Sequence, residues 1–364
     1  MTDARDPADR PVLFVTGHVP AYRVGALAAL HERETLELAT FGGRSKHGGD
    51  VFEGEMPFPH RRVRPRELAR LAASGAYRAV VCPTGGRVAP LAAWAGARRS
   101  HTPLILWASL WAQPRSAAHA LSYAPLRRLY GSADAVVTYG PHVSSYVRAR
   151  GARNVFVAPQ SIDNAFWSEL DVAPPTQPSW PAAQLRFLFV GRDAPEKGLD
   201  VLLAAWRRAQ LRPPSAALVL AGVEPGSARE PGVASLGRLS PSALRDVYAA
   251  SDALVLPSIR TRTFREPWGL VANEAMNRSL PVIASDAVGA VAGGLVRDGV
   301  NGLVVRAGDA DSLAVALRRL ADDAATRARL GARGAHDVQA YSHDAWANGF
   351  SQALSSLGLS RRRW

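Results

Sequence analysis

A buried strand, a sharp turn and the start of a helix can be recognised in Phe187-Leu-Phe-Val-Gly-Arg-Asp-Ala-Pro-Glu-Lys-Gly-Leu-Asp200. The apolar run ends at Gly191, where a tight turn is possible, and Gly198 precedes a helical pattern. Open α/β sheets bind ligands at the carboxyl ends of their strands, which is where Arg192 and Lys197 would emerge. The stretch therefore predicts an α/β domain with two cations at its ligand-binding edge.

The same alternation of short apolar runs and amphipathic stretches extends along the chain, and this is typical of α/β proteins. The runs are continuous, as expected for parallel strands that are covered on both faces. We predict strands at Val12–Thr16, Leu36–Phe41, Arg78–Cys82, Leu104–Trp107, Ala135–Tyr139, Val155–Ala158, Arg186–Val190, Ala217–Ala221, Ala253–Leu256, Val282–Ala284 and Leu303–Val305, with a further short strand before Gly237. We predict helices at Tyr22–His31, Arg66–Ala73, Val88–Ala97, Ala117–Tyr130, His142–Arg150, Leu199–Ala209, Pro241–Ala250, Leu270–Asn277, Asp311–Ala321, Ala324–Gly334 and Asp344–Leu357.

With 364 residues the chain exceeds the usual size of a single core, so two domains are expected. The segment Asp171–Pro181 contains four prolines and no periodic pattern, which indicates a linker. We therefore predict two doubly wound Rossmann-like domains that face each other across a ligand cleft. The first covers 1–170 and the second 186–340, joined by a linker at 171–185. Residues 341–364 are expected to form a helix that crosses back to the first domain, followed by a basic tail.

Lysine is rare in this sequence, which makes Lys197 informative. The chain contains 42 arginines but only two lysines, Lys46 and Lys197. A lysine in so arginine-rich a chain suggests a site that needs a compact, flexible ammonium. Arg192 could bind one part of a diphosphate in a bidentate manner while Lys197 acts as a point charge. The alternative is a solvated cation near the start of a helix.

Two carboxylates stand eight residues apart in Arg265-Glu-Pro-Trp-Gly-Leu-Val-Ala-Asn-Glu-Ala-Met276. Pro267 disfavours helical backbone at Glu266 and suits a first helical turn, so Glu274 would lie on the helix that follows. The segment could bind hydroxyl groups through its carboxylates. It could also bind phosphate through amides near the helix start, those of Trp268, Gly269 and Leu270. The alternative is a solvated helix face with an N-cap.

Composition limits the remaining function classes. The hydrophobic content of 47% and mean hydropathy of −0.06 suit a soluble globular protein, and no apolar run approaches the length of a spanning helix. The first ten residues are polar and charged, unlike a secretory signal. Cys82 is the only cysteine, so an internal disulfide or a zinc–cysteine cluster is excluded and a cytoplasmic location is expected.

The net charge of +13 is concentrated in the first half. The stretch from Pro57 to Tyr130 holds twelve arginines and a single acid, Glu67, for a net charge of +11, and the chain ends in three arginines and Trp364. Such clustering favours a polyanionic neighbour. An anionic membrane surface, with peripheral attachment at its inner face, is one interpretation. A solvated arginine-rich surface and nucleic acid are the alternatives.

The pattern Gly191-Arg192…Glu196-Lys197-Gly198, with Glu266…Glu274 downstream, resembles the retaining glycosyltransferases of family 4, in the group 1 glycosyl transferases, which have the GT-B fold. Other fragments fit this family in the same order: Val255-Leu-Pro-Ser258, Gly269-Leu-Val-Ala-Asn-Glu-Ala275, Pro281-Val-Ile-Ala-Ser-Asp286 and Asp298-Gly-Val-Asn-Gly-Leu303. The resemblance covers about 185–340 well. The first domain is similar only through its strand pattern and His18-Val-Pro-Ala-Tyr-Arg23.

The resemblance implies transfer of a sugar from a nucleoside-diphosphate-sugar, UDP- or GDP-linked, to an acceptor hydroxyl, with retention at the anomeric carbon and without a metal or cofactor. Polysaccharide, glycolipid or glycoconjugate biosynthesis would be its setting, and the acceptor would be a saccharide or a lipid-linked molecule. Glu266, Lys197 and Arg192 would be catalytic, with Glu266 on the donor sugar and the two cations on the diphosphate. Donor-binding roles would fall to Glu274 on the ribose and to Gly191, Trp268, Gly269, Leu270, Gly237, Arg238, Leu239 and Ser258.

The chain departs from many relatives at two places. The expected glycine-rich turn after the first strand reads Gly17-His-Val-Pro-Ala-Tyr-Arg-Val-Gly25, and no histidine directly follows the fourth strand. His18, Arg23, Gly25 and His119 are therefore the candidates for the acceptor side of the cleft. The segment 259–265 is longer than in many relatives, and its arginines (Arg260, Arg262 and Arg265) could extend the phosphate site or belong to a solvated insertion.

Three other functions share some of these features. A nucleotide-sugar hydrolase or epimerase could have the same two-domain cleft. A basic nucleic-acid-binding protein could explain the charge, although no aromatic-interleaved basic stripe or zinc site is present in the sequence. A non-catalytic relative would not need Arg192, Lys197 and both glutamates together.

Overall fold

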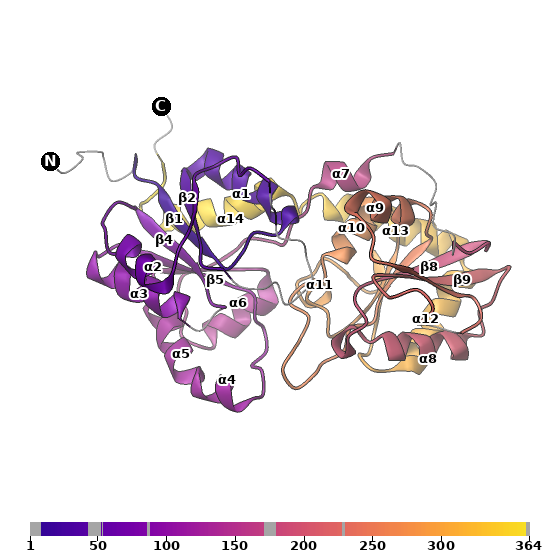
Figure 1. The fold of residues 1–364 in the computed structure, drawn as a ribbon. Helices are drawn as coiled ribbons and strands as arrows, with labels where there is room; N and C mark the ends of the chain where they lie inside the picture. Colours follow the sequence, from indigo (N-terminus) through magenta and orange to yellow (C-terminus); the bar gives the residue numbers. More distant parts are fainter. Residues whose placement is uncertain are drawn as a thin grey trace. The chain divides into compact units, whose positions relative to one another are not determined.

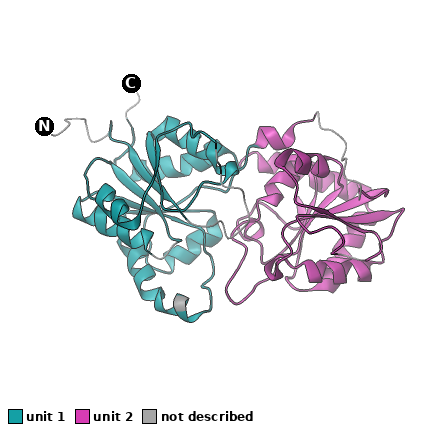
Figure 2. Ribbon diagram, viewed as in Figure 1, with its two compact units in different colours: residues 1–163, 341–364 teal, residues 164–340 magenta. Residues whose placement is uncertain are grey.

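The computed structural model describes residues 9–42, 52, 54–85, 88–170, 180–227 and 230–361 (Figure 1). The chain forms two compact units, coloured separately in Figure 2. Unit 1 comprises Met1–Asp163 and Tyr341–Trp364, and unit 2 comprises Asn164–Ala340.

Unit 1 contains a seven-stranded parallel sheet in the order β3-β2-β1-β4-β5-β6-β7. Its strands are β1 (Val12–Thr16), β2 (Leu36–Thr40), β3 (His60–Arg62), β4 (Ala79–Pro83), β5 (Leu104–Ala108), β6 (Ala135–Thr138) and β7 (Val155–Val157). The chain adds strands on one side of β1 and then continues from β4 on the other side. The boundary between β1 and β4 is therefore the point where the strand order reverses.

The strands of unit 1 are apolar throughout because both faces of the sheet are covered. Val12 and Phe14 of β1 belong to one buried cluster, whereas Leu13 and Val15 belong to another. This is the period-2 alternation of a strand buried on both sides. Helices α1 (Ala21–Glu34) and α14 (His343–Ser356) pack on the Phe14 face. The opposite face is covered by α2 (Pro65–Ala72), α3 (Ala89–Arg99), α5 (Tyr123–Ser132) and α6 (Pro141–Arg148).

Helix α14, from the end of the chain, is part of the core of unit 1 and lies beside α1 (Figure 1). Its residues Trp346 and Phe350 pack on Phe14, with ring centroids 6.1 and 5.5 Å away. Because Gly349 lies so close to β7 that a Cβ would be 2.3 Å from the Val157 carbonyl oxygen, only glycine allows this approach. Residues 341–364, which we expected to return to the first domain, thus group with unit 1.

Unit 2 contains a six-stranded parallel sheet in the order β10-β9-β8-β11-β12-β13. Its strands are β8 (Leu185–Val190), β9 (Ala216–Ala221), β10 (Val233–Gly237), β11 (Ala253–Leu256), β12 (Val282–Ser285) and β13 (Gly302–Val305). Phe187 of β8 packs on Trp206 of α8 (Leu199–Ala209), with ring centroids 6.0 Å apart. The same cluster includes Leu313 and Leu317 of α12 (Ala310–Asp322). The other helices are α7 (Asn164–Ser168), α9 (Pro241–Ala249), α10 (Val271–Asn277), α11 (Gly289–Ala292) and α13 (Ala324–Val338).

The prediction of two parallel α/β sheets is confirmed, with several local differences. The sequence analysis missed β3, an edge strand of exposed, charged residues without apolar periodicity. The single helix predicted over Ala117–Tyr130 is two helices, α4 (Ala117–Leu121) and α5, interrupted at Ser122. The first unit ends at Asp163 rather than at residue 170, because α7 belongs to unit 2. Of the predicted linker 171–185, residues 171–179 lie outside the described residues. Within the described ranges, every helix is too short or too polar to cross a bilayer.

Candidate functional site

The carboxyl ends of the strands in unit 2 bring the predicted donor-binding segments to one edge of the sheet. Backbone hydrogen bonds tie the turn after β8 to its neighbours: the Gly191 amide donates to Ala221 (2.9 Å), and the Gly222 amide donates to Gly237 (2.7 Å). The Ile259 amide, after β11, donates to the Glu196 carbonyl (3.0 Å). The strand order of unit 2 reverses between β8 and β11, so this edge is where open α/β sheets bind ligands.

Gly198 connects the short 3-10 turn Pro195–Lys197 to α8 at a position that only glycine can occupy. Its φ is +70°, and a Cβ would lie 2.2 Å from the Pro257 carbonyl oxygen. The loop that carries Lys197 is thereby held against the loop after β11.

We expect Gly198→Ala to destabilise unit 2 more than Gly226→Ala does. Both glycines have positive φ, and so both alanines meet left-handed strain of about 1–2 kcal/mol. Only Gly198 also faces a backbone clash, which adds about 1–3 kcal/mol, since nothing lies within 4 Å of a Cβ at Gly226. Urea unfolding of the two variants measures the difference. Equal losses would show that the loops after β8 and β11 are not held together as described.

Lys197 and Glu266, which are 69 positions apart in the sequence, form an ion pair with 2.5 Å between Nζ and Oε2. Their side chains are 19% and 10% exposed, so the pair is largely removed from solvent but still reachable. An ammonium has three donors, and the pair with Glu266 uses one of them. Both residues were predicted to bind the donor, and the structure adds that they are direct partners.

Arg192 lies beside this pair in sequence but is more exposed. Its guanidinium donates to Glu196 at 2.9 Å, and its side chain is 45% exposed. In the longer segment 259–265, Arg260 pairs with Asp286 at 3.0 Å. Burial, and secondarily the nearby Arg260, lowers the pKa of Arg265. Arg260 thus has a carboxylate partner in unit 2, and Arg262 is exposed.

The turn from Trp268 to Leu270 is fixed by packing of its side chains and backbone. The indole of Trp268 is buried and donates to Asn273 at 2.8 Å, while its carbonyl accepts from the Ala290 amide at 2.7 Å. Gly269 has φ +93°, and a Cβ there would lie 2.9 Å from a methyl group of Leu256. Helix α10 begins at Val271, one residue later than predicted, and the three residues lead into it.

Glu274 on α10 has a partner that the sequence did not reveal. The hydroxyl of the buried Tyr248, on α9, donates to Glu274 Oε2 at 2.7 Å. Desolvation raises the pKa of Glu274 to about 7, against the smaller lowering effect of the Tyr248 hydrogen bond. No sequence signal separates Tyr248 from other apolar positions of its helix, because the contact depends on how α9 and α10 pack. Glu274 can therefore change its charge near neutral pH.

The other predicted donor residues of unit 2 differ in accessibility. Gly237 has φ +69° at the end of β10, and Arg238 and Leu239 follow it at the same edge of the sheet. Ser258 was expected to contact the donor, but its side chain is fully buried and its carbonyl accepts from the Ser285 hydroxyl. The Ser258 side chain is thus inaccessible in this structure, and its contact with the donor stays a prediction.

In unit 1, two of the four predicted acceptor residues line one pocket and two do not. His18 and Arg23 line a pocket of about 240 Å³ at the carboxyl ends of β1, β4 and β5. Gly25 instead marks the close approach of α1 and α14, since a Cβ would lie 2.5 Å from the His343 ring. His119 lies on α4, where its Nδ1 is 2.7 Å from the Ser116 hydroxyl, and it is not among the residues that line this pocket. Gly25 and His119 thus do not line this pocket, and their roles on the acceptor side stay predictions.

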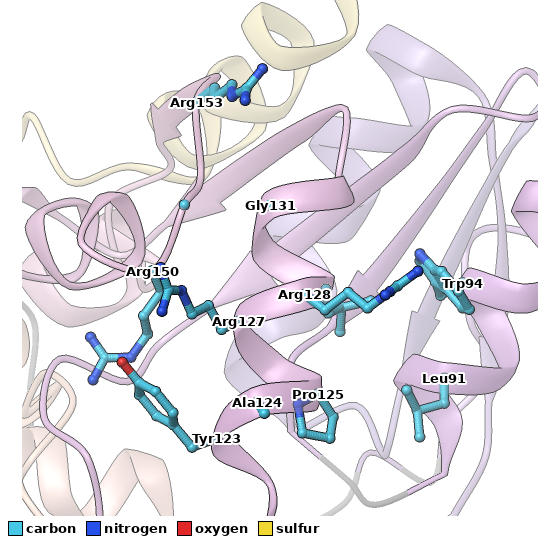
Figure 3. Close-up of a pocket in the computed structure, with 12 residues that line it drawn as sticks. Leu91, Trp94, Tyr123, Ala124, Pro125, Arg127, Arg128, Gly131, Arg150 and Arg153 are labelled. Carbon is cyan, nitrogen blue, oxygen red and sulfur yellow. The ribbon is translucent and has the colours of Figure 1, made fainter.

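A larger hollow of about 870 Å³ lies on another part of unit 1 (Figure 3). It is lined by α3, α5 and the turn after α6, and its lining includes Arg127, Arg128, Arg150 and Arg153. Figure 3 shows Arg128 extending toward Trp94, and the Arg150 guanidinium is 5.6 Å from the ring centroid of Tyr123. None of the described residues that line it is acidic.

The sequence of unit 2 is similar to that of known glycosyltransferases. Residues 176–337 match the family model described as "Glycosyl transferases group 1". The D-inositol 3-phosphate glycosyltransferases of Kineococcus radiotolerans and Streptomyces avermitilis are 34% and 31% identical over 197 and 198 residues. These matches cover 46% and 48% of this chain but only 43% and 40% of the relatives, so the chain matches less than half of their length.

The fold is similar to solved structures over nearly the whole chain. HepE of Anabaena, solved in complex with UDP and glucose, superposes with a TM-score of 0.71 at 19% identity, covering 95% of this chain and 100% of that one. Sucrose-phosphate synthase from Thermosynechococcus elongatus gives 0.72 at 22% identity, with coverages of 96% and 99%. Together with the two parallel sheets, this confirms the predicted α/β architecture of the GT-B type. At the level of sequence, the match to the group 1 glycosyl transferase family model covers residues 176–337, which are less than half of the chain.

Proposed function

We propose that the protein is a retaining glycosyltransferase that moves a sugar from a nucleoside-diphosphate-sugar to an acceptor hydroxyl. The observation that carries the proposal is the largely buried Lys197–Glu266 pair at the ligand-binding edge of unit 2, within the segment that matches the family model. The pair places a cation and a carboxylate side by side. A sugar attached to a diphosphate presents anionic oxygens and hydroxyl groups equally close together.

In this proposal each charged side chain has one task. Lys197 retains donors for an oxygen of the diphosphate while it also contacts Glu266, whose carboxylate accepts hydrogen bonds from hydroxyls of the donor sugar. Arg192 exchanges its exposed contact with Glu196 for the diphosphate. Glu274 binds the ribose hydroxyls, and backbone groups of Trp268, Gly269, Leu270 and Gly237 complete the donor site.

The chemistry is a substitution at the anomeric carbon. The bond from this carbon to the diphosphate oxygen breaks, and a bond to the acceptor oxygen forms on the same face of the sugar. The acceptor proton passes to the departing phosphate, so no side-chain base is required. Lys197 and Arg192 stabilise the negative charge that develops on the leaving group, and a single donor of this kind contributes about 3–4 kcal/mol. The proposal therefore includes no metal or cofactor.

A panel of nucleotide-sugars tests whether the protein binds such a donor and identifies which one it binds. UDP-, GDP- and ADP-linked hexoses are added to the full chain, and the free energy of unfolding is followed. The correct donor at a hundred times its Kd should stabilise the protein by about 2.7 kcal/mol. The donor is then incubated with and without candidate acceptors. Transfer only with acceptor supports the proposal, whereas release of free sugar or an altered sugar identifies a hydrolase or an epimerase. Absence of stabilisation by every nucleotide-sugar contradicts it.

We further propose that unit 1 binds an anionic membrane surface through the arginine-rich hollow shown in Figure 3. Exposed side chains with apolar surface are among the residues that line it: Leu91 is 47% exposed and Tyr123 is 39% exposed. Each arginine near an anionic surface contributes about 1 kcal/mol, so four are enough for reversible attachment. This would bring the enzyme to a lipid-linked acceptor at the inner face of the membrane.

Sedimentation with vesicles tests this surface. The protein should sediment with phosphatidylglycerol vesicles at low salt and not with phosphatidylcholine vesicles. Replacing both Arg127 and Arg128 by glutamine should release it. Arg207 and Arg208 of α8 are the matched control, because they are also adjacent helix arginines and their loss changes the net charge equally. The same release by both double variants would assign binding to net charge instead of to this surface.

A further inference from the structure

We propose that the pocket around Arg23 in unit 1 binds an oxyanion, a phosphate or carboxylate group, which the acceptor substrate carries. This inference rests on the proposed function and deepens it, since it names the chemical class of the acceptor. The pocket lies at the carboxyl ends of β1, β4 and β5, next to the point where the strand order of unit 1 reverses. Ligands bind at such points in open α/β sheets.

Arg23 carries a permanent charge that is buried in the protein. Arg23 is 3% exposed, and within the described parts of the chain no carboxylate lies within ion-pairing distance of it. A guanidinium keeps its charge in a protein, and a buried charge without a counter-ion is unfavourable. One nitrogen, Nη2, donates to the side-chain oxygen of Gln160. The aromatic rings of Trp107 and Trp346 lie 5.4 and 5.1 Å from the guanidinium carbon and offset part of the charge.

Two nitrogen donors at the pocket lack a hydrogen-bond acceptor among the described residues. Arg23 Nη1 and Trp107 Nε1 are both buried, and neither has a hydrogen-bond partner among the described residues. Both side chains line the pocket. Buried donors are nearly always satisfied in folded proteins, so two orphans on one cavity indicate a ligand or ordered water that accepts from them. An oxyanion accepts from both and also neutralises Arg23.

The composition and the size of the cavity also suit an oxyanion. Among the described residues that line it, none is acidic, while Thr16, Ser109 and Tyr139 supply hydroxyl groups. Burial raises the pKa of Tyr139 to about 12, so its hydroxyl remains a donor at neutral pH. The volume of about 240 Å³ is below the roughly 300–1,000 Å³ of pockets for drug-sized ligands. The pocket therefore suits one charged group of a substrate and not a whole substrate.

A titration followed by NMR tests the site in the full chain. Inorganic phosphate and acetate are added separately, and the indole N–H signal of Trp107, assigned from a Trp107→Phe spectrum, is monitored. We expect a saturable shift with at least one of the two anions, and the anion that binds more tightly distinguishes a phosphate site from a carboxylate site. Loss of a charge-assisted hydrogen bond in Arg23→Gln should weaken this binding about tenfold to a hundredfold. Arg33→Gln is the control, because Arg33 lies on the same helix but pairs with Asp344 outside the pocket.

Several outcomes would overturn the inference. An unchanged Trp107 signal with both anions would show that the pocket holds only water, and an equal shift in Arg23→Gln would place the anion elsewhere. If Arg23→Gln does not fold, Arg23→Lys takes its place. This variant keeps the charge but replaces the planar fork of the guanidinium by a single nitrogen, which cannot occupy the positions of both Nη1 and Nη2, so binding should again weaken. Binding of the nucleotide-sugar to unit 2 is measured on the same samples. A negative anion titration with intact donor binding rejects this inference alone, whereas loss of donor binding in the unmodified chain rejects the proposed function.

Discussion

Replacing Lys197 by alanine is expected to lower the rate of sugar transfer about a hundredfold to a thousandfold. The ammonium that would stabilise the departing diphosphate is removed, and no other lysine lies in unit 2. The variant also removes the cation that pairs with the Glu266 carboxylate, whose side chain is 10% exposed. Its free energy of unfolding should therefore fall, by about 1–3 kcal/mol.

The double variant Lys197→Ala, Glu266→Gln separates these two effects. Neutralising Glu266 removes the carboxylate that has lost the Lys197 cation, so the stability should recover in part while transfer stays low. Arg192→Ala should also lower transfer, but with a change in stability below about 1 kcal/mol because its ion pair is exposed. Arg207→Ala is the matched control, since Arg207 forms a similarly exposed pair with Glu230 in the same unit. Wild-type rates in both Lys197→Ala and Arg192→Ala would remove the diphosphate assignment.

Glu274 is expected to make nucleotide binding depend on pH in the neutral range. Because desolvation raises its pKa from 4.5 to about 7, only about a tenth of the ligand-free protein carries the ionised form at about pH 6. In the proposed donor site, the ribose hydroxyls would donate to the ionised carboxylate. The Kd of the nucleotide should therefore fall about tenfold between about pH 6 and about pH 8, and change little above that. The stability of the ligand-free chain depends on pH in the opposite sense. The contribution of Glu274 to the free energy of unfolding is fully present below pH 4.5 and is lost as the pH rises through 7.

Two variants test whether this pH dependence comes from the hydrogen-bonded pair of Tyr248 and Glu274. The Glu274→Gln variant should bind the nucleotide about tenfold to a hundredfold more weakly at high pH. The part of the pH dependence that comes from Glu274 should disappear, while any part that comes from titration of the nucleotide phosphates remains. In Tyr248→Phe the hydrogen bond that lowers the pKa of Glu274 is gone, so the midpoint should move to higher pH. Isothermal titration calorimetry across the pH range measures both. A step of the same size and position in all three proteins would show that Glu274 does not titrate in the site.

Local features of the fold were the ones predicted best from the amino-acid sequence. Continuous apolar runs located β1 and β11 with their observed bounds, because strands buried on both faces need apolar residues at every position. Gly191 and Gly198 were recognised beside the cations as a turn and the start of a helix, and the structure adds that Gly198 has a left-handed backbone. The charged edge strand β3 was not predicted, since it has no buried face and so no pattern.

Contacts between distant segments could not be predicted in the same way. Both Lys197 and Glu266 were identified as site residues, but their direct pairing depends on β8 and β11 being neighbours in the sheet. Ser258 matched the family pattern, yet its side chain is fully buried. Gly25 and His119 were grouped with His18 because of their residue types, and the packing of α1 on α14 and the position of α4 separated them.

By itself, then, the amino-acid sequence determined the fold class, the order of the strands along the chain and the charged residues at the carboxyl edge of unit 2. These follow from periodicity, glycine and composition, which act over a few neighbouring residues. Only the tertiary structure decided that Tyr248 faces Glu274 and that Arg23 is buried beside Trp107, with no carboxylate paired to it among the residues that the structure describes. Desolvation and hydrogen bonding depend on what packs around a group, and those neighbours come from parts of the chain that are remote in sequence.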